Sequence, residues 1–226
     1  MKKLLLLIAI SAIPGFLLSH AQAQIGDFGA IGEVKFSKEL SRVVEISVGQ
    51  ELRFNQFATS LSRSATSLES DITIIDKVLR ANFEYKLLFN RENGIYETRH
   101  RTSAGLLMLY NYNQFKFRLK TRLQSTYRDV ETGEFKFNPR YVWRNNLELR
   151  YDIFGSRFTP FAYAESFCRL NSINGFYLNS FRLGAGTKYR LSQFNTLNLE
   201  LRFDQDIQVP NPDNIVNLNV GWSHKL

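Results

Sequence analysis

The final stretch of the sequence, residues 216–226, alternates between apolar and polar side chains. Its apolar positions are Val216, Leu218, Val220, Trp222 and Leu226. Only His224 interrupts this register, and a period of two over such a length predicts an extended strand with one apolar and one polar face. The last strand of an outer-membrane barrel has to pair with the first, and it commonly ends on an apolar or aromatic residue. We therefore predict that residues 216–226 form the closing strand of such a barrel and carry its assembly signal.

Similar stretches follow one another along the chain. They occupy residues 44–54, 68–74, 79–87, 96–110, 115–128, 141–151, 158–168, 181–190 and 197–204. Together with the final stretch they predict about ten strands, and residues 31–36 are a candidate for one more short strand. Bacterial single-chain barrels have even strand numbers, so ten or twelve strands are expected rather than eleven. The predicted fold is all-β: an antiparallel transmembrane β-barrel of about 10–12 strands in a single domain, residues 24–226.

The beginning of the sequence has the features of an export signal. Lys2 and Lys3 precede a mostly apolar segment, residues 4–18, and Ala21-Gln22-Ala23 has the small-x-small pattern of a signal-peptidase site. We predict that residues 1–23 are a signal peptide, because the apolar segment is short for a membrane-spanning helix. No later apolar run is long enough for a transmembrane helix, so strands would have to cross the membrane.

The predicted connections differ in length between the two ends of the barrel. The tight links lie at residues 76–78, 111–113 and 192–193. The longer links lie at residues 56–66, 129–139, 171–175 and 208–214. Outer-membrane barrels have short periplasmic turns and longer outer loops, so we predict that the tight end is periplasmic. The links at 37–42 and 152–157 fit less well, and an additional strand at 31–36 would place the N-terminus outside.

Alternation alone does not distinguish a membrane barrel from a soluble, lipocalin-like binding barrel, whose apolar face points inward. Three features favour the membrane barrel. Arginines and glutamates share the polar face, which suits a hydrogen-bonded lumen. Aromatic residues lie near strand ends, as in the girdles at the two membrane interfaces. Several stretches are also long enough to cross a bilayer as tilted strands.

Basic residues outnumber acidic ones by 27 to 21 once Lys2 and Lys3 are removed with the predicted signal peptide. They alternate singly with apolar residues, so rings and guanidinium groups point to opposite faces and binding of nucleic acid is not predicted. The predicted positive wall of the lumen consists of Arg99, Arg101, Lys116, Arg118, Lys120, Arg122, Arg144 and Arg150. The predicted negative wall consists of Glu45, Glu51, Glu69, Asp71, Glu200 and Asp204.

These walls allow two interpretations. In the first, the charges remain apart and create a field across the lumen. In the second, they form a salt-bridge network that fills the barrel. A barrel of about ten strands has little spare width, which favours the filled network. If a pore remains open, its basic excess would prefer anions.

Candidates for catalysis are few. The mature chain has two histidines, His100 and His224, and hydrolase chemistry needs such a base beside a nucleophile. Ser103 falls on the face opposite His100 if this stretch is a regular strand. Neither histidine has a second histidine or a cysteine at the spacing of a metal site, so no metal ligand and no cofactor is predicted. Cys168 is the only cysteine, which excludes an intramolecular disulfide and suggests a small structural residue.

Four segments resemble an uncharacterised family. They are Glu51-Leu52-Arg53-Phe54, Tyr85-Lys86-Leu87, residues 160–167 (PFAYAESF) and residues 182–191 (RLGAGTKYRL). The family is domain of unknown function 2490, typical of Bacteroidetes-type, Gram-negative bacteria, and its members look like small outer-membrane barrels. The resemblance extends over most of the mature chain, and it implies a location and a fold. It implies no reaction and no catalytic residues.

The sequence therefore predicts an exported protein of the cell outer membrane. The expected function is that of a small structural or binding barrel with a largely occluded, charged lumen. The alternatives are a narrow anion-preferring channel, an outer-membrane hydrolase and a soluble lipocalin-like barrel. Its expected partners are outer-membrane lipids and the barrel-assembly machinery, whereas no particular ligand or oligomeric state is predicted.

Overall fold

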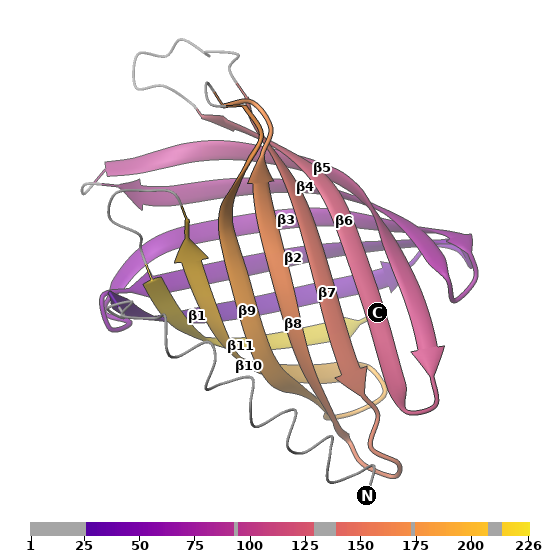
Figure 1. Ribbon diagram of the computed structural model, residues 1–226. Helices are drawn as coiled ribbons and strands as arrows, with labels where there is room; N and C mark the ends of the chain where they lie inside the picture. The colour runs from indigo at the N-terminus through magenta and orange to yellow at the C-terminus, as the bar shows by residue number, and fades with distance from the viewer. Residues whose placement is uncertain (1–25, 93–94, 129–138, 173–174, 208–213) are drawn as a thin grey trace, which may run out of the picture.

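The computed structural model describes residues 26–92, 95–128, 139–172, 175–207 and 214–226, so the predicted signal peptide lies outside the described residues. These residues form eleven strands in one closed barrel (Figure 1). The strands are β1 (Asp27–Glu39), β2 (Val44–Asn55), β3 (Ser60–Ile75), β4 (Leu79–Glu92), β5 (Ile95–Tyr112), β6 (Phe115–Arg128), β7 (Arg140–Tyr151), β8 (Phe158–Arg169), β9 (Tyr177–Arg190), β10 (Asn195–Asp206) and β11 (Asn214–Lys225). Within the described ranges, no helix has the length and apolar character needed to span a membrane.

The barrel closes through a parallel pair of strands. Every strand is antiparallel to its neighbour in the sequence, but β1 and β11 run parallel, with Ala30 opposite Leu218. The ladder continues past the strands, because the Leu226 N–H donates to the Ser37 carbonyl (2.7 Å). Parallel strands cannot be joined by a tight hairpin, but β1 and β11 are the first and last strands of the sheet and need no connection to each other.

The closure corrects two expectations. The strand number falls within the predicted range, but it is odd among the described residues, so the expectation of ten or twelve was wrong. The candidate short strand at 31–36 is part of β1, a strand of 13 residues. Gly32 interrupts its outward apolar register, and Ile31 places an apolar residue on its inward face, which is why its length was not evident. Because β1 is parallel to β11, β1 begins at the end of the barrel opposite Leu226. This is the end at which an additional strand at 31–36 was expected to place the N-terminus.

The connections also differ partly from expectation. Tight turns at 76–78, 113–114 and 191–194 join strands at the end where β11 finishes, and the opposite end carries the connections that follow β6, β8 and β10. The predicted long link at 56–66 is wrong, because β2 ends at Asn55 and β3 begins at Ser60. The outward face of β3 begins with small polar residues, which hid its alternation.

The turn at residues 56–59 has an unusual backbone. Gln56, Phe57 and Ala58 all have positive φ angles (54°, 54° and 62°), a region that side chains with a Cβ rarely adopt. The Asp27 carboxylate accepts hydrogen bonds from the backbone N–H groups of Gln56 (2.8 Å) and Phe57 (3.1 Å). An acidic group at the start of β1 therefore stabilises the turn between β2 and β3.

The distribution of side chains is inverted relative to a soluble barrel. Polar residues are buried inside, among them Asn82 and Asn217, each with 0% of its surface exposed. Large apolar residues face outward, with Leu147 at 55% and Leu201 at 58% exposure. A lipocalin-like barrel has the opposite arrangement, so the soluble alternative was wrong. A few apolar side chains, such as Leu88 and Phe161, are buried with the polar ones inside the barrel.

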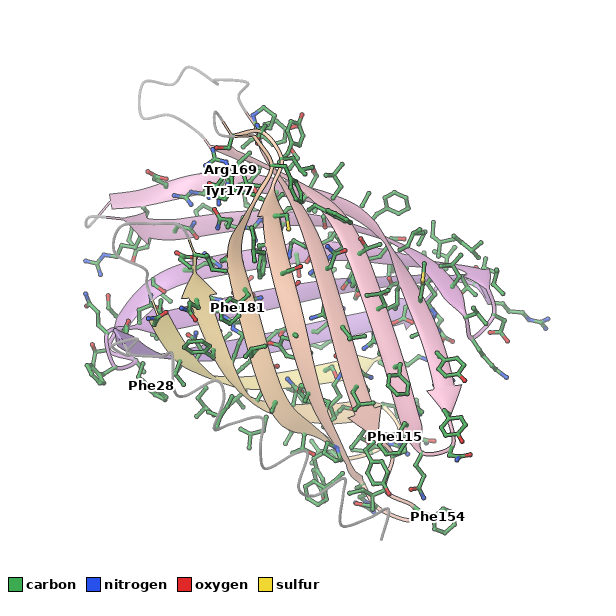
Figure 2. The ribbon with its side chains drawn as sticks, in the orientation of Figure 1. Phe28, Phe115, Phe154, Arg169, Tyr177 and Phe181 are labelled. Carbon is green, nitrogen blue, oxygen red and sulfur yellow. The ribbon has the colours of Figure 1, made fainter. Side chains whose placement is uncertain are left out.

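Aromatic side chains gather at the end where β11 finishes. Rings of Phe115 and Tyr151 lie 5.0 Å apart, and those of Phe158 and Tyr189 lie 4.6 Å apart. In Figure 2, Phe115 lies at the end of the barrel close to Phe154 of the 152–157 turn. Aromatic residues at strand ends, among them the amphipathic Tyr151 and Tyr189, match the interfacial girdle of membrane barrels.

Candidate functional site in the barrel interior

The predicted charged walls occupy two different sectors of the barrel. The basic residues Arg99, Arg101, Lys116, Arg118, Lys120, Arg122, Arg144 and Arg150 lie on the adjacent strands β5, β6 and β7. The acidic residues Glu45, Glu51, Glu69, Asp71, Glu200 and Asp204 lie on β2, β3 and β10, which belong to the other side of the strand order. Lys116 and Glu45 lie at strand ends, and Lys116 pairs with Asp152 of the 152–157 turn (2.5 Å).

These sectors are joined by charged residues that the sequence analysis did not single out. They are Lys35, Arg53, Glu84, Lys86, Glu148, Glu165, Arg182 and Arg202. All of them occupy the inward register of their strands, so the same period-two pattern would have included them. Their partners depend on which strands face each other, and the alternation within one strand does not contain that information.

Glu165 on β8 is a carboxylate with several basic partners in the interior. It is 5% exposed and accepts hydrogen bonds from Arg144 Nη2 (2.8 Å), Arg182 Nη1 (3.1 Å) and Arg122 Nη2 (3.4 Å). The guanidinium groups of Arg144 and Arg182 also lie over the ring of Phe167, at 4.7 and 5.1 Å from its centroid. One buried carboxylate thus balances three arginines from β6, β7 and β9.

The pairs around Glu165 continue into a belt around the inner wall. We define the charge belt as Glu51, Lys86, Glu84, Arg122, Glu165, Arg182, Asp204 and Arg53. Consecutive members have opposite charges and form ion pairs with N–O distances from 2.5 Å (Arg182–Asp204) to 4.0 Å (Arg53–Asp204). The belt begins and ends on β2, so opposite charges alternate around the interior.

Other ion pairs cross the interior directly. The Glu69 carboxylate on β3 binds Lys35 of β1 (2.5 Å) and Lys120 of β6 (3.2 Å). Two strands separate β3 from β6, and strands are about 4.8 Å apart, which amounts to roughly 14 Å along the wall. The side chains of Lys120 and Glu69 therefore meet over the lumen. Glu148 on β7 forms a separate group of ion pairs with Arg118 of β6 (3.2 Å) and Arg150 of β7.

A cavity of about 300 Å³ lies beside the charge belt. It is lined by Leu107, Arg118, Lys120, Arg122, Arg144, Asn146, Glu148, Tyr163, Glu165, Arg182, Glu200, Arg202 and Asn219. The Tyr163 hydroxyl donates to the Glu200 carboxylate (2.5 Å). A Cβ on Gly184 would overlap the Tyr163 ring, so this glycine makes room for the tyrosine that orients Glu200.

The two histidines of the described residues, His100 and His224, lie on the outer surface. His100 Nδ1 is 2.7 Å from the Tyr85 hydroxyl, whereas Ser103 is buried inside and its hydroxyl donates to Glu84 (3.3 Å). The expectation that Ser103 lies opposite His100 is confirmed. His224 Nδ1 is 2.9 Å from Asn195 Oδ1, beside the rings of Phe36 and Trp222. Among the residues that the structure describes, no three His, Cys, Asp or Glu side chains are grouped so that they could hold a metal ion.

Comparisons with known proteins agree with the fold. The family described as protein of unknown function (DUF2490) matches residues 28–214. The structure is similar to that of a bacterial polysaccharide outer membrane secretin, with a TM-score of 0.51 and 9% sequence identity, over 81% of this chain and 63% of the secretin chain. It is also similar to the NanC porin, with a TM-score of 0.50 and 14% identity, over 78% of this chain and 86% of the porin chain. No curated protein matches the sequence.

At these identities the likeness to the secretin and the porin concerns the fold. The chain spans 63% of the length of the secretin chain. Both similar structures are barrels of the outer-membrane kind, so an outer-membrane location is suggested by fold as well as by the exposed apolar surface.

Proposed function

The chain belongs to the DUF2490 family of proteins of unknown function, and from this premise we propose that it is an outer-membrane barrel with an occluded, charged lumen. Its function is that of a structural or binding barrel. The observation that carries the proposal is the charge belt, together with the Lys120–Glu69 pair that crosses the interior. The predicted signal peptide at residues 1–23 would direct the export that such a location requires.

The outer surface supports a lipid environment. Leu147, Leu199, Leu201 and Val220 lie on the outward faces of β7, β10 and β11 and are each about half exposed in the isolated barrel. Large exposed apolar surfaces are unfavourable in water and favourable in the hydrocarbon core of a bilayer. Lipids of the outer membrane are therefore the proposed partners of this surface.

The ion pairs support an occluded interior. Breaking a buried pair by removing one partner leaves an uncompensated charge, which costs about 3–5 kcal/mol. An ion that passed through the belt would have to displace several such pairs, because Arg122, Arg182 and Asp204 each bind more than one partner. The ion pairs between its own side chains thus keep the lumen closed to ions.

Recording of the refolded protein in planar bilayers tests this proposal. We expect no stepwise conductance at any voltage that the bilayer withstands, while a general porin added to the same bilayer conducts and confirms that the assay works. Folding of the sample would be verified by its heat-dependent migration in gels. Regular conductance steps would contradict the occluded lumen.

Anion-selective steps would favour the second candidate, a narrow anion-preferring channel. One observation favours this candidate: the lining of the cavity contains six basic residues but three carboxylates. A reversal potential measured across a salt gradient would show the sign of the preference. The same recordings therefore distinguish the two functions.

We also propose that β11 contacts the barrel-assembly machinery during insertion. Trp222 lies opposite Val34 of β1 and packs edge-on against Phe36, with ring centroids 5.5 Å apart. Trp222→Asp is expected to reduce the amount of folded protein in the membrane, because a carboxylate would replace an outward ring at the closing seam. Heat-dependent gel migration of the membrane fraction measures this amount, and Ser223→Asp, on the inward face of the same strand, is the control. Equal assembly of Trp222→Asp and wild type would contradict the proposal.

A further inference from the structure

The cavity beside the charge belt contains buried polar atoms that no described residue satisfies. Arg202 is 7% exposed, and its Nη2 has no hydrogen-bond acceptor among the described residues. Its Nε lies 3.2 Å from Asp204 Oδ2 as an ion pair, without the alignment of a hydrogen bond. Asn219 is 6% exposed, and its Oδ1 has no donor within the same described ranges. Buried polar groups are almost always hydrogen-bonded, so both atoms point to a missing partner.

The charges around these atoms favour an anion. The basic residues of the lining are Arg118, Lys120, Arg122, Arg144, Arg182 and Arg202, and the acidic ones are Glu148, Glu165 and Glu200. Glu165 is already shared by three arginines. Guanidinium groups bind carboxylates through charge-assisted and often bidentate hydrogen bonds. A carboxylate near Arg202 would satisfy the Nη2 that has no acceptor among the described residues.

The neighbouring acceptors favour hydroxyl groups on the same ligand. Glu200 and Asn219 lie directly opposite each other on β10 and β11. The Glu200 carboxylate accepts the Tyr163 hydroxyl, and a carboxylate can accept further donors. The Asn219 Oδ1 likewise requires a donor. A ligand with hydroxyl groups beside its carboxylate would supply these donors next to Arg202, which lies two residues from Glu200 on the same face of β10.

We propose that this cavity binds a small hydroxylated carboxylate, with the carboxylate at Arg202 and hydroxyl groups at Asn219 and Glu200. The assignment rests on the proposed function of a binding barrel and names the class of its ligand. The volume of about 300 Å³ lies at the lower end of ligand pockets, which suits a compact acid. Gly184 contributes by leaving space for Tyr163, which holds Glu200 in position.

Calorimetric titration of the full-length barrel in detergent tests the site with three probes of similar length. Gluconate carries a carboxylate and hydroxyl groups, hexanoate carries the carboxylate alone, and sorbitol carries hydroxyl groups alone. We expect gluconate to bind at least tenfold more tightly than either of the others. Equal binding of gluconate and hexanoate would overturn the hydroxyl contacts, and absence of gluconate binding would overturn the site.

Two variants locate the binding. Arg202→Gln is expected to weaken gluconate about tenfold or more, because a charge-assisted hydrogen bond is lost. Arg80→Gln is the matched control, since Arg80 also has a buried Nε without a partner among the described residues but does not line the cavity. If Arg202→Gln does not fold, Asn219→Leu provides the second test and should weaken gluconate while leaving hexanoate unchanged. Unchanged gluconate affinity in the folded variants would overturn the assignment.

The outcome separates this inference from the proposed function. Gluconate binding together with regular conductance steps would contradict the occluded lumen but would support the carboxylate site at Arg202. A barrel that neither conducts nor binds gluconate would agree with the occluded lumen and would overturn the carboxylate site.

Discussion

Glu165→Gln is expected to lower the free energy of unfolding of the barrel by about 3–5 kcal/mol, the typical effect of removing one partner from a buried ion pair. The amide keeps the shape of the carboxylate but removes its charge. Arg122, Arg144 and Arg182 then remain together in the interior without the group that balances them. Urea titration of the refolded protein, followed by gel migration or tryptophan fluorescence, measures the change.

The control for this prediction is Asp152→Asn. It also removes a carboxylate from an ion pair, that of Lys116 and Asp152, but both side chains are more than 40% exposed. Surface pairs contribute about 0–1 kcal/mol, so the stability should change little. If the two variants were equally stable, the Glu165 cluster would not be the stabilising centre of the interior.

Leu201→Arg is expected to destabilise the barrel in a bilayer by about 2–4 kcal/mol, the effect of an arginine near the midplane on the lipid-facing side of a barrel. Leu201 lies in the middle of β10, and 58% of its surface is exposed. The charge would therefore enter the hydrocarbon core. Reversible unfolding from lipid vesicles gives the free energy directly.

Phe154→Arg is the matched control for the lipid-facing variant. Phe154 is 95% exposed and lies in the turn between β7 and β8, beyond the ends of the strands. An arginine at the membrane interface has a small effect of about 0–1 kcal/mol. A loss of stability at Phe154 as large as that at Leu201 would show that the outward strand faces are not distinguished by membrane depth.

Much of the wall was predictable from local patterns. The stretches at 115–128, 141–151 and 197–204 alternate clearly, and each corresponds to a strand within a few residues. Patterns failed where outward side chains are not large and apolar. Ala30 and Gly32 obscured β1, while Ser64 and Thr66 obscured the first half of β3 and made a short turn resemble a long loop.

The candidate site was less predictable than the wall. Lys120, Arg122 and Arg144 were predicted as basic residues of the lumen, whereas Glu84 and Glu165, to which two of them bind, were not predicted as members of a charged wall. Gly184 had no role assigned from the sequence. The reason for a glycine there became evident only with the Tyr163 ring lying across it.

Where the alternation is clear, the sequence by itself determined which residues share a face of a strand, because side chains alternate within each strand regardless of its neighbours. It also determined that the interior would be charged. Only the tertiary structure decided that eleven strands close through a parallel pair, and which charges meet across the lumen. The physical reason is that ion-pair partners such as Lys120 and Glu69 are set by strand order and register around the closed sheet. Those are properties of the whole barrel, and no single strand contains them.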